Sequence, residues 1–283
     1  MKRLSLGFSP CPNDTFIFCA LVNGRITLDG WGLQPAVLED VETLNAWAMQ
    51  GRLDITKLSF HALGHVLDDY ILLDSGAAIG RGCGPLLVGR RKVDSAAFAG
   101  MTVAVPGKYT TAAMLLQLYG PVWQNVVILR FDEIMPAVAS GRVDCGVIIH
   151  ESRFTYRSYG LELIVDLGAW WEEMSGHPIP LGGIAARRSL GREIIVKIDR
   201  AVRASIQWAH HNDKLCRPYI KKYSQELDES VINEHIGLYV NSFSENMGGE
   251  GIAAVEYFLK KGIEAGLFAE TRQKSLTINQ LFQ

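Results

Sequence analysis

A nearly repeated stretch of sequence constrains the fold of this 283-residue chain more than any other feature. Residues 51–59 read GRLDITKLS and residues 141–150 read GRVDCGVIIH. In each copy a Gly ends a helix-like segment, an Asp follows three residues later, and an apolar strand runs into polar residues. Open α/β sheets bind their ligands at such strand ends. The repeat therefore predicts two βαβ-type lobes whose polar strand ends, Lys57 and Ser59 in one and His150 in the other, face a ligand cleft between them.

Strand-like and helix-like stretches alternate along most of the chain, which is typical of parallel sheets. The expected strands are 4–8, 33–38, 54–58, 70–75, 85–90, 102–105, 126–130, 145–149, 164–166 and 181–186. The expected helices are 16–23, 39–49, 60–67, 110–119, 132–140, 192–211 and 252–265.

The chain is expected to cross twice between the lobes and to return through a helical C-terminal region. This pattern predicts an α/β fold with a discontinuous lobe I, residues 1–87 and 185–283, and a continuous lobe II, residues 88–184. Hinge strands are expected near residues 84–90 and 181–187. Each lobe is expected to hold a mainly parallel sheet flanked by helices.

Composition and charge exclude several classes of protein. The chain is 48% hydrophobic and 20% charged, which is ordinary for a globular protein. Its 28 basic and 30 acidic residues are mixed, with a net charge of −2 and no basic stripe, so we expect no nucleic-acid partner. No apolar stretch reaches the roughly 18 residues of a membrane span, so we expect no membrane partner either.

The start of the chain carries two basic residues before apolar ones, as a signal peptide does. The segment Ser9–Asp14 contains two prolines and breaks this run early. The five cysteines are odd in number and scattered, and none forms a CxxC pair, so neither a disulfide framework nor a metal site is expected. A reducing cytoplasm is the simplest compartment for such a chain.

Four segments carry a resemblance to a known family: SPCPNDTF at residues 9–16, KLS at 57–59, PGKYTTA at 106–112 and IHESRFTY at 149–156. With them the chain resembles the 1,4-dihydroxy-6-naphthoate synthases of the futalosine route to menaquinone. The architecture resembles the periplasmic-binding-protein type II fold. The resemblance covers essentially the whole chain. The SPCPND and HESR motifs are its specific part.

The resemblance implies the reaction and its participants. The substrate would be cyclic dehypoxanthine futalosine, a small-molecule carboxylate. A carbon–carbon lyase reaction would remove the carbons left from the ribose and aromatise the ring to 1,4-dihydroxy-6-naphthoate, without a metal or organic cofactor. His150 matches the family's proton acceptor. Lys57, Leu58 and Ser59 together with Thr110 and Thr111 match its substrate-binding segments.

Elementary chemistry is compatible with a catalytic His150. Imidazole titrates near neutral pH and can both take and return a proton. The alternative is a strand-end His that bonds a carbonyl group. Glu151 either orients the imidazole or caps the next helix, and the residues alone do not choose between these roles.

The remaining candidates each have a structural alternative. Thr110 and Thr111 begin a helix, where N–H groups and hydroxyls bind anions, although one Thr can simply cap the helix. Lys57 pairs with the substrate carboxylate or stays solvated at the end of its strand. Ser59 binds a substrate hydroxyl or caps the helix that follows.

Asn13 and Asp14 lie in a rigid loop after the first strand, which should border the same cleft. They either bind substrate hydroxyls or, in the case of Asp14, cap the next helix.

Two other functions compete with the synthase. A non-catalytic small-molecule-binding protein shares the fold, and fold does not determine function. Chorismate dehydratase acts in the same pathway, but the segments SPCPND and PGKYTT favour the synthase. A monomer and a homodimer are equally compatible with the sequence.

Overall fold

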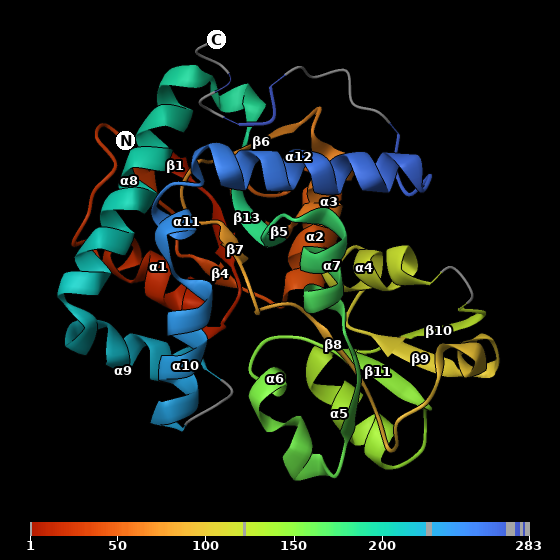
Figure 1. Cartoon of the computed structure of the whole chain (residues 1–283). Coiled ribbons are helices and arrows are strands. Elements are labelled where there is room, and N and C mark those ends of the chain that lie inside the picture. The colour runs from red at the N-terminus through yellow and green to blue at the C-terminus, as the bar shows by residue number, and fades with distance from the viewer. Residues whose placement is uncertain (1, 121–122, 225–227, 270–274, 278–279, 281–283) are drawn as a thin grey trace. The chain divides into compact units, whose positions relative to one another are not determined.

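A computed structural model describes residues 2–120, 123–224, 228–269, 275–277 and 280 (Figure 1). The chain forms two compact α/β units: unit 1 contains residues 1–80 and 180–283, and unit 2 contains residues 81–179. The chain therefore leaves unit 1, builds unit 2 and returns to unit 1.

The predicted boundaries, after residues 87 and 184, fall inside two strands. Strand β8 (Leu86–Gly89) pairs with strands of unit 2, and β13 (Ile179–Arg187) pairs with strands of unit 1. Each strand therefore belongs to one unit.

The sheet of unit 1 has the strand order β4-β2-β5-β13-β6, and β7 pairs with β13. These strands are β2 (Leu6–Phe8), β4 (Val37–Leu38), β5 (Ile55–Ser59), β6 (Tyr70–Leu72) and β7 (Ala78–Gly80). Strand β2 is parallel to β4 and β5, whereas β13 is antiparallel to β5 and β6. The sheet is therefore mixed, and the reversed strand is the one by which the chain returns from unit 2.

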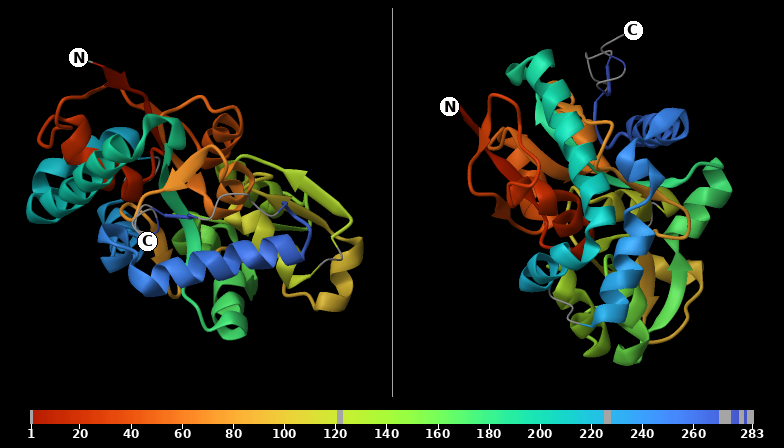
Figure 2. Two further views of the ribbon diagram at one scale, coloured as in Figure 1. Left: turned by 90° about the horizontal axis from the view of Figure 1, so that it is seen from above. Right: turned by 90° about the vertical axis from the view of Figure 1, so that its left-hand side faces the viewer.

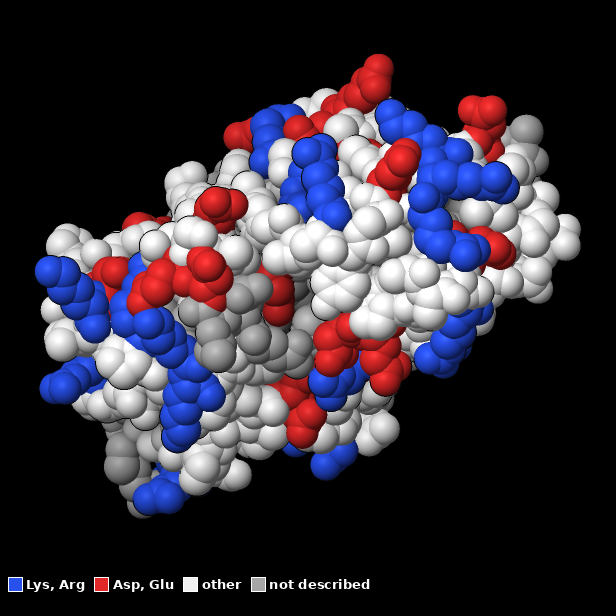
Figure 3. Space-filling model, turned by 90° about the horizontal axis from the view of Figure 1, so that it is seen from below, with Lys and Arg blue, Asp and Glu red and all other residues white. Residues whose placement is uncertain are grey.

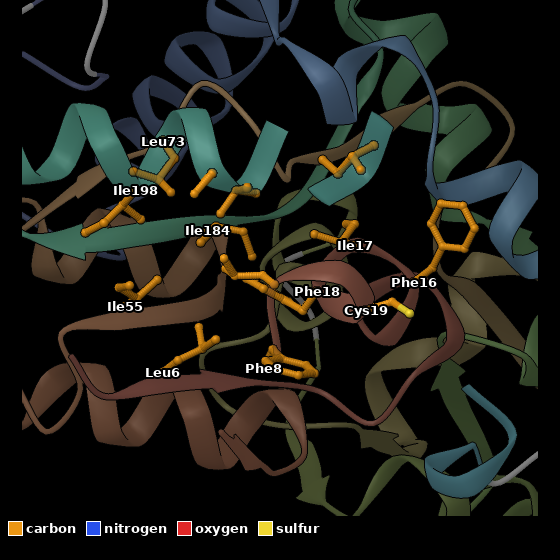
Figure 4. Packing of buried hydrophobic residues seen from close by; sticks show 14 of the residues in the cluster. Leu6, Phe8, Phe16, Ile17, Phe18, Cys19, Ile55, Leu73, Ile184 and Ile198 are labelled. Atoms are coloured by element: carbon orange, nitrogen blue, oxygen red, sulfur yellow. The ribbon is translucent and has the colours of Figure 1, made fainter. Parts of the chain in front are cut away.

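Helix α1 (Pro12–Val22) is the centre of unit 1. Its residues from Pro12 to Leu21 are all buried, so the helix is enclosed on every side rather than on one face. Three further helices pack around it (Figures 1 and 2): α8 (Arg192–His211), α9 (Asp213–Tyr223) and α10 (Glu229–Tyr239). The rings of Phe8 and Phe18 stack with centroids 4.5 Å apart, which joins the sheet to α1 in the core (Figure 4).

The other helices of unit 1 are α2 (Val41–Met49), α3 (Phe60–Val66), α11 (Ser242–Glu245), α12 (Gly248–Glu264) and the short 3₁₀ turn η3 (Arg188–Leu190). Helices α2 and α3 contact β5, and α12 packs on α3. Helix α2 begins after Asp40, whose carboxylate accepts from the backbone N–H groups of Glu42 and Thr43.

Two predicted elements of unit 1 are wrong in their bounds. The first helix begins at Pro12, not at residue 16, and Cys11 rather than Asp14 occupies the N-cap position. Proline fits the first helical position because the N–H that it lacks has no partner there anyway. The strand predicted at residues 33–38 is two strands, β3 (Gly32–Leu33) and β4, with Pro35 between them. Strand β3 pairs with β1 (Arg3–Leu4) in a separate ladder.

The sheet of unit 2 has the order β10-β9-β11-β8-β12. Its strands besides β8 are β9 (Thr102–Val105), β10 (Asn125–Ile128), β11 (Cys145–Ile148) and β12 (Glu162–Asp166). Strand β9 is parallel to β10 and β11, while β8 is antiparallel to β11 and β12. In unit 2, too, one strand is reversed, and it is the one by which the chain enters.

The helical segments of unit 2 are α4 (Thr111–Tyr119), α5 (Phe131–Ala139), α6 (Ser152–Thr155), α7 (Leu167–Ser175), η1 (Ser95–Gly100) and η2 (Tyr156–Tyr159). Helix α5 lies directly on β11 because Gly146 has no side chain. A Cβ at Gly146 would lie 2.4 Å from Cγ2 of Ile134. The core of this unit forms between α5 and the sheet.

The repeated sequence has the same structural role in both units. Gly51 and Gly141 follow α2 and α5 with φ of 61° and 77°, a conformation that glycine adopts without steric cost. Three residues on, Asp54 Oδ2 accepts from the backbone N–H of Ser5 at 2.8 Å, and Asp144 Oδ2 accepts from that of Thr102 at 2.8 Å. Each Asp thus ties its strand to the start of the neighbouring parallel strand.

Two further observations concern the helices and the surface. No helix in the described ranges is both long enough and apolar enough to cross a membrane. On the face shown in Figure 3, Lys and Arg side chains are interspersed with Asp and Glu side chains, in line with the net charge of −2.

Candidate functional site

In unit 2 the predicted site residues follow two neighbouring parallel strands. Ala104 of β9 is paired with Gly146 of β11, so the carboxyl ends of these strands lie at the same edge of the sheet. The chain continues from β9 through a short loop to Thr110 and from β11 to His150. This edge is where open α/β sheets hold their ligands.

His150 has a strained backbone. Its φ is 57°, and within the described ranges it is the one residue other than glycine with a positive φ. The left-handed conformation costs about 1–2 kcal/mol for a residue with a Cβ. Such strain persists where the surrounding structure imposes it, and it clusters at functional sites. The imidazole is partly exposed and meets the ring of Phe131 edge-on, with centroids 5.3 Å apart.

The two threonines of unit 2 have different positions. Thr110 is the N-cap of α4: its hydroxyl accepts from the N–H of Ala113 at 3.2 Å and donates to the carbonyl of Gly107 at 2.9 Å. The capping role that the sequence allows for either Thr therefore falls to Thr110. Thr111 is the first helical residue, and both side chains are buried.

Glu151 stands at the N-cap position of α6, yet its side chain makes no capping hydrogen bond. Of the two roles that the sequence leaves open for Glu151, capping is therefore not seen.

In unit 1 the predicted residues again follow two neighbouring parallel strands. Leu6 of β2 is paired with Ile55 of β5, which places the Ser9–Asp14 segment and the end of β5 at one edge of the sheet. Alternation along β5 puts Lys57 on the same side as Ile55, toward α1. The Nζ of Lys57 lies 2.6 Å from Oδ1 of Asp14, and both side chains are buried.

Asp14 is surrounded by donors from the protein. Its Oδ1 accepts from Lys57 and from the amide of Asn13 at 2.9 Å. Its Oδ2 accepts from the hydroxyl and backbone N–H of Ser9 at 2.7 and 3.2 Å. Of the two roles that the sequence leaves open for Asp14, capping is not seen, because Asp14 lies inside α1 and its two oxygens bind Lys57, Asn13 and Ser9.

The other two residues of the KLS segment, Leu58 and Ser59, differ in the atoms that are available for a ligand. Ser59 begins α3, but its side chain makes no capping bond there. Its hydroxyl accepts from Nδ2 of Asn45 at 3.1 Å, and its backbone N–H donates to Oδ1 of Asn45 at 2.9 Å. The side chain of Leu58 is wholly buried, so only its backbone is available for a ligand.

Sequence reasoning missed two buried polar residues of unit 1. Asn45 lies among apolar residues on the buried face of α2, and a polar residue in that pattern was the available signal. His235 lies on α10 with its Nε2 3.0 Å from Oδ1 of Asn13, although 222 positions separate them in sequence. No pattern in the sequence connects these two residues. Within each unit taken alone, the described side chains bring together no set of three metal ligands.

Comparison with solved structures defines the class of fold. A protein of Candida albicans, described as having the generic periplasmic-binding-protein fold, is similar with a TM-score of 0.66 and 15% identity, over 96% of this chain and 92% of its own. A protein of Archaeoglobus fulgidus is similar with a TM-score of 0.88 and 35% identity, over 94% and 98% of the two chains. The chain thus has a periplasmic-binding-protein-like fold, which confirms the predicted fold class.

The family is more specific than the fold. The model of a family described as menaquinone biosynthesis matches residues 4–264. A Thermus thermophilus protein named 1,4-dihydroxy-6-naphthoate synthase is 51% identical over 98% of this chain and 96% of its own length. A Streptomyces coelicolor protein of the same name is 44% identical over 93% and 94% of the two chains. This chain belongs to the menaquinone biosynthesis family, as its four motifs indicate.

Proposed function

We propose that this protein converts cyclic dehypoxanthine futalosine to 1,4-dihydroxy-6-naphthoate by a carbon–carbon lyase reaction in the cytoplasm. The names of its two relatives support the product and the pathway. The observation that carries the proposal here is the strained His150 at the carboxyl edge of the sheet of unit 2, beside Phe131. The four family motifs all lie at or just after the carboxyl ends of strands.

His150 is the proton acceptor in this proposal. A retro-aldol-type cleavage begins when a base removes the proton of a substrate hydroxyl, and the electron pair of that O–H bond forms a carbonyl as the adjacent C–C bond breaks. The electrons of the C–C bond remain on the ring carbon, which takes a proton back. A partly exposed imidazole can accept the first proton and supply the second, so the reaction needs no added oxidant or reductant.

Three of the other predicted residues, Lys57, Thr111 and Ser59, bind the substrate in this proposal. An ammonium group has three N–H donors, and in the part of the chain that the structure describes Lys57 gives one of them to Asp14. The others can donate to a substrate carboxylate or carbonyl. Thr111 and the first N–H groups of α4 form a second anion-binding element, and the start of a helix carries a partial positive charge. Ser59 is the partner for a substrate oxygen.

The test is turnover of cyclic dehypoxanthine futalosine by the purified wild type and His150→Ala, with the product identified by mass and substrate binding measured by calorimetry. His211→Ala is the matched control, because His211 is exposed at the end of α8. We expect the wild type and the control to form product, and His150→Ala to be slower by about 10²–10⁴-fold while still binding.

Other outcomes point to other functions. Binding without turnover by the wild type would indicate a small-molecule-binding protein. Turnover of chorismate instead would indicate the dehydratase. Equal turnover by wild type and His150→Ala would keep the enzyme and remove His150 as its base.

A further inference from the structure

Four buried side chains form a continuous polar chain through unit 1, from β5 to α10. Lys57 Nζ donates to Asp14 at 2.6 Å, Asn13 Nδ2 donates to Asp14 at 2.9 Å, and His235 Nε2 lies 3.0 Å from Asn13 Oδ1. Their exposed fractions are 5% or less, and that of His235 is 0%. Burying a polar group costs free energy unless the group is hydrogen-bonded. This series of hydrogen bonds is therefore a structural feature of unit 1.

The donors and acceptors of these hydrogen bonds follow a defined order. A carboxylate can only accept hydrogen bonds, so the Asn13 amide must present its NH₂ group to Asp14. The amide oxygen then faces His235, and Nε2 of that imidazole must carry the proton that it donates. A reversed amide would set an oxygen against the Asp14 carboxylate. The contacts therefore assign the Nε2–H form to His235.

The same contacts hold Asp14 in place. Both of its oxygens accept two donors each, from Lys57, Asn13 and Ser9. Both oxygens of Asp14 and the amide of Asn13 are therefore engaged by partners within unit 1. Together these contacts fix the Asp14 carboxylate, and the ion pair with this carboxylate fixes the position of Lys57 Nζ.

Helix α10 supports this arrangement from the far end. His235 is in contact with the ring of Tyr239 on the same helix, with centroids 4.6 Å apart, which restricts the plane of the imidazole. A fixed imidazole fixes the Asn13 oxygen, and through it the Asp14–Lys57 pair.

We propose that His235 is a positioning residue for substrate binding: through Asn13 and Asp14 it holds the ammonium group of Lys57 where a substrate oxygen is bound. This inference rests on the proposed function, in which Lys57 binds substrate. It predicts that His235 affects KM through Lys57 and has little effect on kcat, because it does not touch the reacting atoms.

A double-mutant cycle tests the coupling. His235→Phe removes the donor and keeps an aromatic ring, whereas His235→Gln keeps an N–H donor at about the reach of Nε2. We expect His235→Phe to raise KM about tenfold or more with kcat within about threefold, and His235→Gln to restore KM to within about threefold of wild type. In a Lys57→Met background, His235→Phe should raise KM no further, because contacting residues of one network are non-additive.

An equal rise of KM in both backgrounds, or no rescue by His235→Gln, would overturn the positioning role. If His235→Phe does not fold, Asn13→Ala takes its place in the same cycle and interrupts the chain one residue closer to Lys57.

A second measurement does not depend on the reaction. Nitrogen-15 NMR of histidine side chains, with His235 assigned from the spectrum of His235→Gln, reports which ring nitrogen carries the proton. We expect the Nε2–H form in the wild type, and the Nδ1–H form would overturn the inference. If the protein shows the Nε2–H form but does not turn over the futalosine substrate, the proposed function fails and the hydrogen-bond chain stands.

Discussion

The ring of Phe131 meets the imidazole of His150 edge to face, with centroids 5.3 Å apart and ring planes at 72°. Phe131 begins α5 after β10, and His150 follows β11, so the contact joins two loops at one edge of the sheet of unit 2. Edge-to-face pairs contribute about 0.5–1.5 kcal/mol beyond buried area. The contact with Phe131 therefore restricts the plane of the imidazole.

Replacing Phe131 by Leu should lower kcat more than it affects substrate binding. The substitution keeps an apolar side chain of similar size but removes the aromatic contact, so we expect kcat to fall about three- to tenfold. Steady-state kinetics with calorimetric binding would measure this. Phe98→Leu is the control, since Phe98 stacks on Trp123 elsewhere in unit 2 and should leave kcat unchanged. An unchanged kcat in Phe131→Leu would show that the contact has no role in catalysis.

The positive φ of His150 predicts that two inactive variants differ in stability. His150→Gly removes the strain of the left-handed conformation, while His150→Ala keeps it. We expect the glycine variant to be more stable than the alanine variant by about 1 kcal/mol, with both inactive. Urea denaturation of the two variants checks the difference. Equal stability would mean that the backbone relaxes once the imidazole is absent.

The buried pair of Asp14 and Lys57 predicts unequal costs for removing its members. Asp14→Leu leaves a buried ammonium group without its partner and should lower the free energy of unfolding by about 3–5 kcal/mol. Lys57→Met should cost less, because Ser9 and Asn13 still donate to the carboxylate. Chemical denaturation measures both.

Asp132→Ala serves as the control for this comparison. Its partner Arg130 has a side chain that is 58% exposed, and an exposed ion pair contributes at most about 1 kcal/mol. A larger cost for Lys57→Met than for Asp14→Leu would contradict the predicted order.

Much of the fold follows from local patterns that the sequence displays. Strand β9 lies at residues 102–105, as predicted, because an apolar run between polar turns marks a short buried strand. The position of His150 just beyond β11 follows from the same reasoning. Such predictions need only the hydrophobic periodicity of the sequence and the residues that end strands and helices.

The rest depends on contacts between distant segments. Pro12 looks like a helix breaker in sequence, yet it begins α1, because the first turn of a helix does not use its N–H. The pairing of Lys57 with Asp14 spans 43 positions, and that of His235 with Asn13 spans 222. No short-range pattern encodes either contact, so the sequence identified Asp14 as a candidate but did not reveal its pairing with Lys57.

The two threonines at the start of α4 should separate stability from binding. Thr110→Ala removes the cap and should lower the free energy of unfolding by about 1 kcal/mol. Thr111→Val keeps the shape of the side chain but removes the hydroxyl, so we expect weaker substrate binding and little loss of stability. Parallel denaturation and calorimetry distinguish these effects. A Thr110→Ala variant that loses only binding would assign the ligand contact to the capping residue instead.

Two buried thiols predict a loss of stability at high pH. Burial raises the pKa of Cys83 and Cys145 to about 12, from an ordinary value of 9.0. Below pH 9.0 both thiols hold their protons in both states, and the stability is complete. Above it the unfolded chain releases protons that the folded chain retains, so the free energy of unfolding falls as pH rises toward 12.

Urea midpoints measured at about pH 8 and about pH 10 check this loss, whose slope is at most about 1.4 kcal/mol per pH unit for each thiol. A variant with Cys83→Ala and Cys145→Ala should show a shallower fall. An identical fall in that variant would assign the effect to other groups.

The insertion of unit 2 within unit 1 also sets an order of events during protein synthesis. Residues 81–179 leave the ribosome as one continuous stretch, so unit 2 has all its strands before unit 1 does. Strand β13 lies between β5 and β6, and until it is made these strands have unpaired edges that can join other chains. The sheet that carries Lys57 and Ser59 is therefore incomplete until residues 179–187 have been translated.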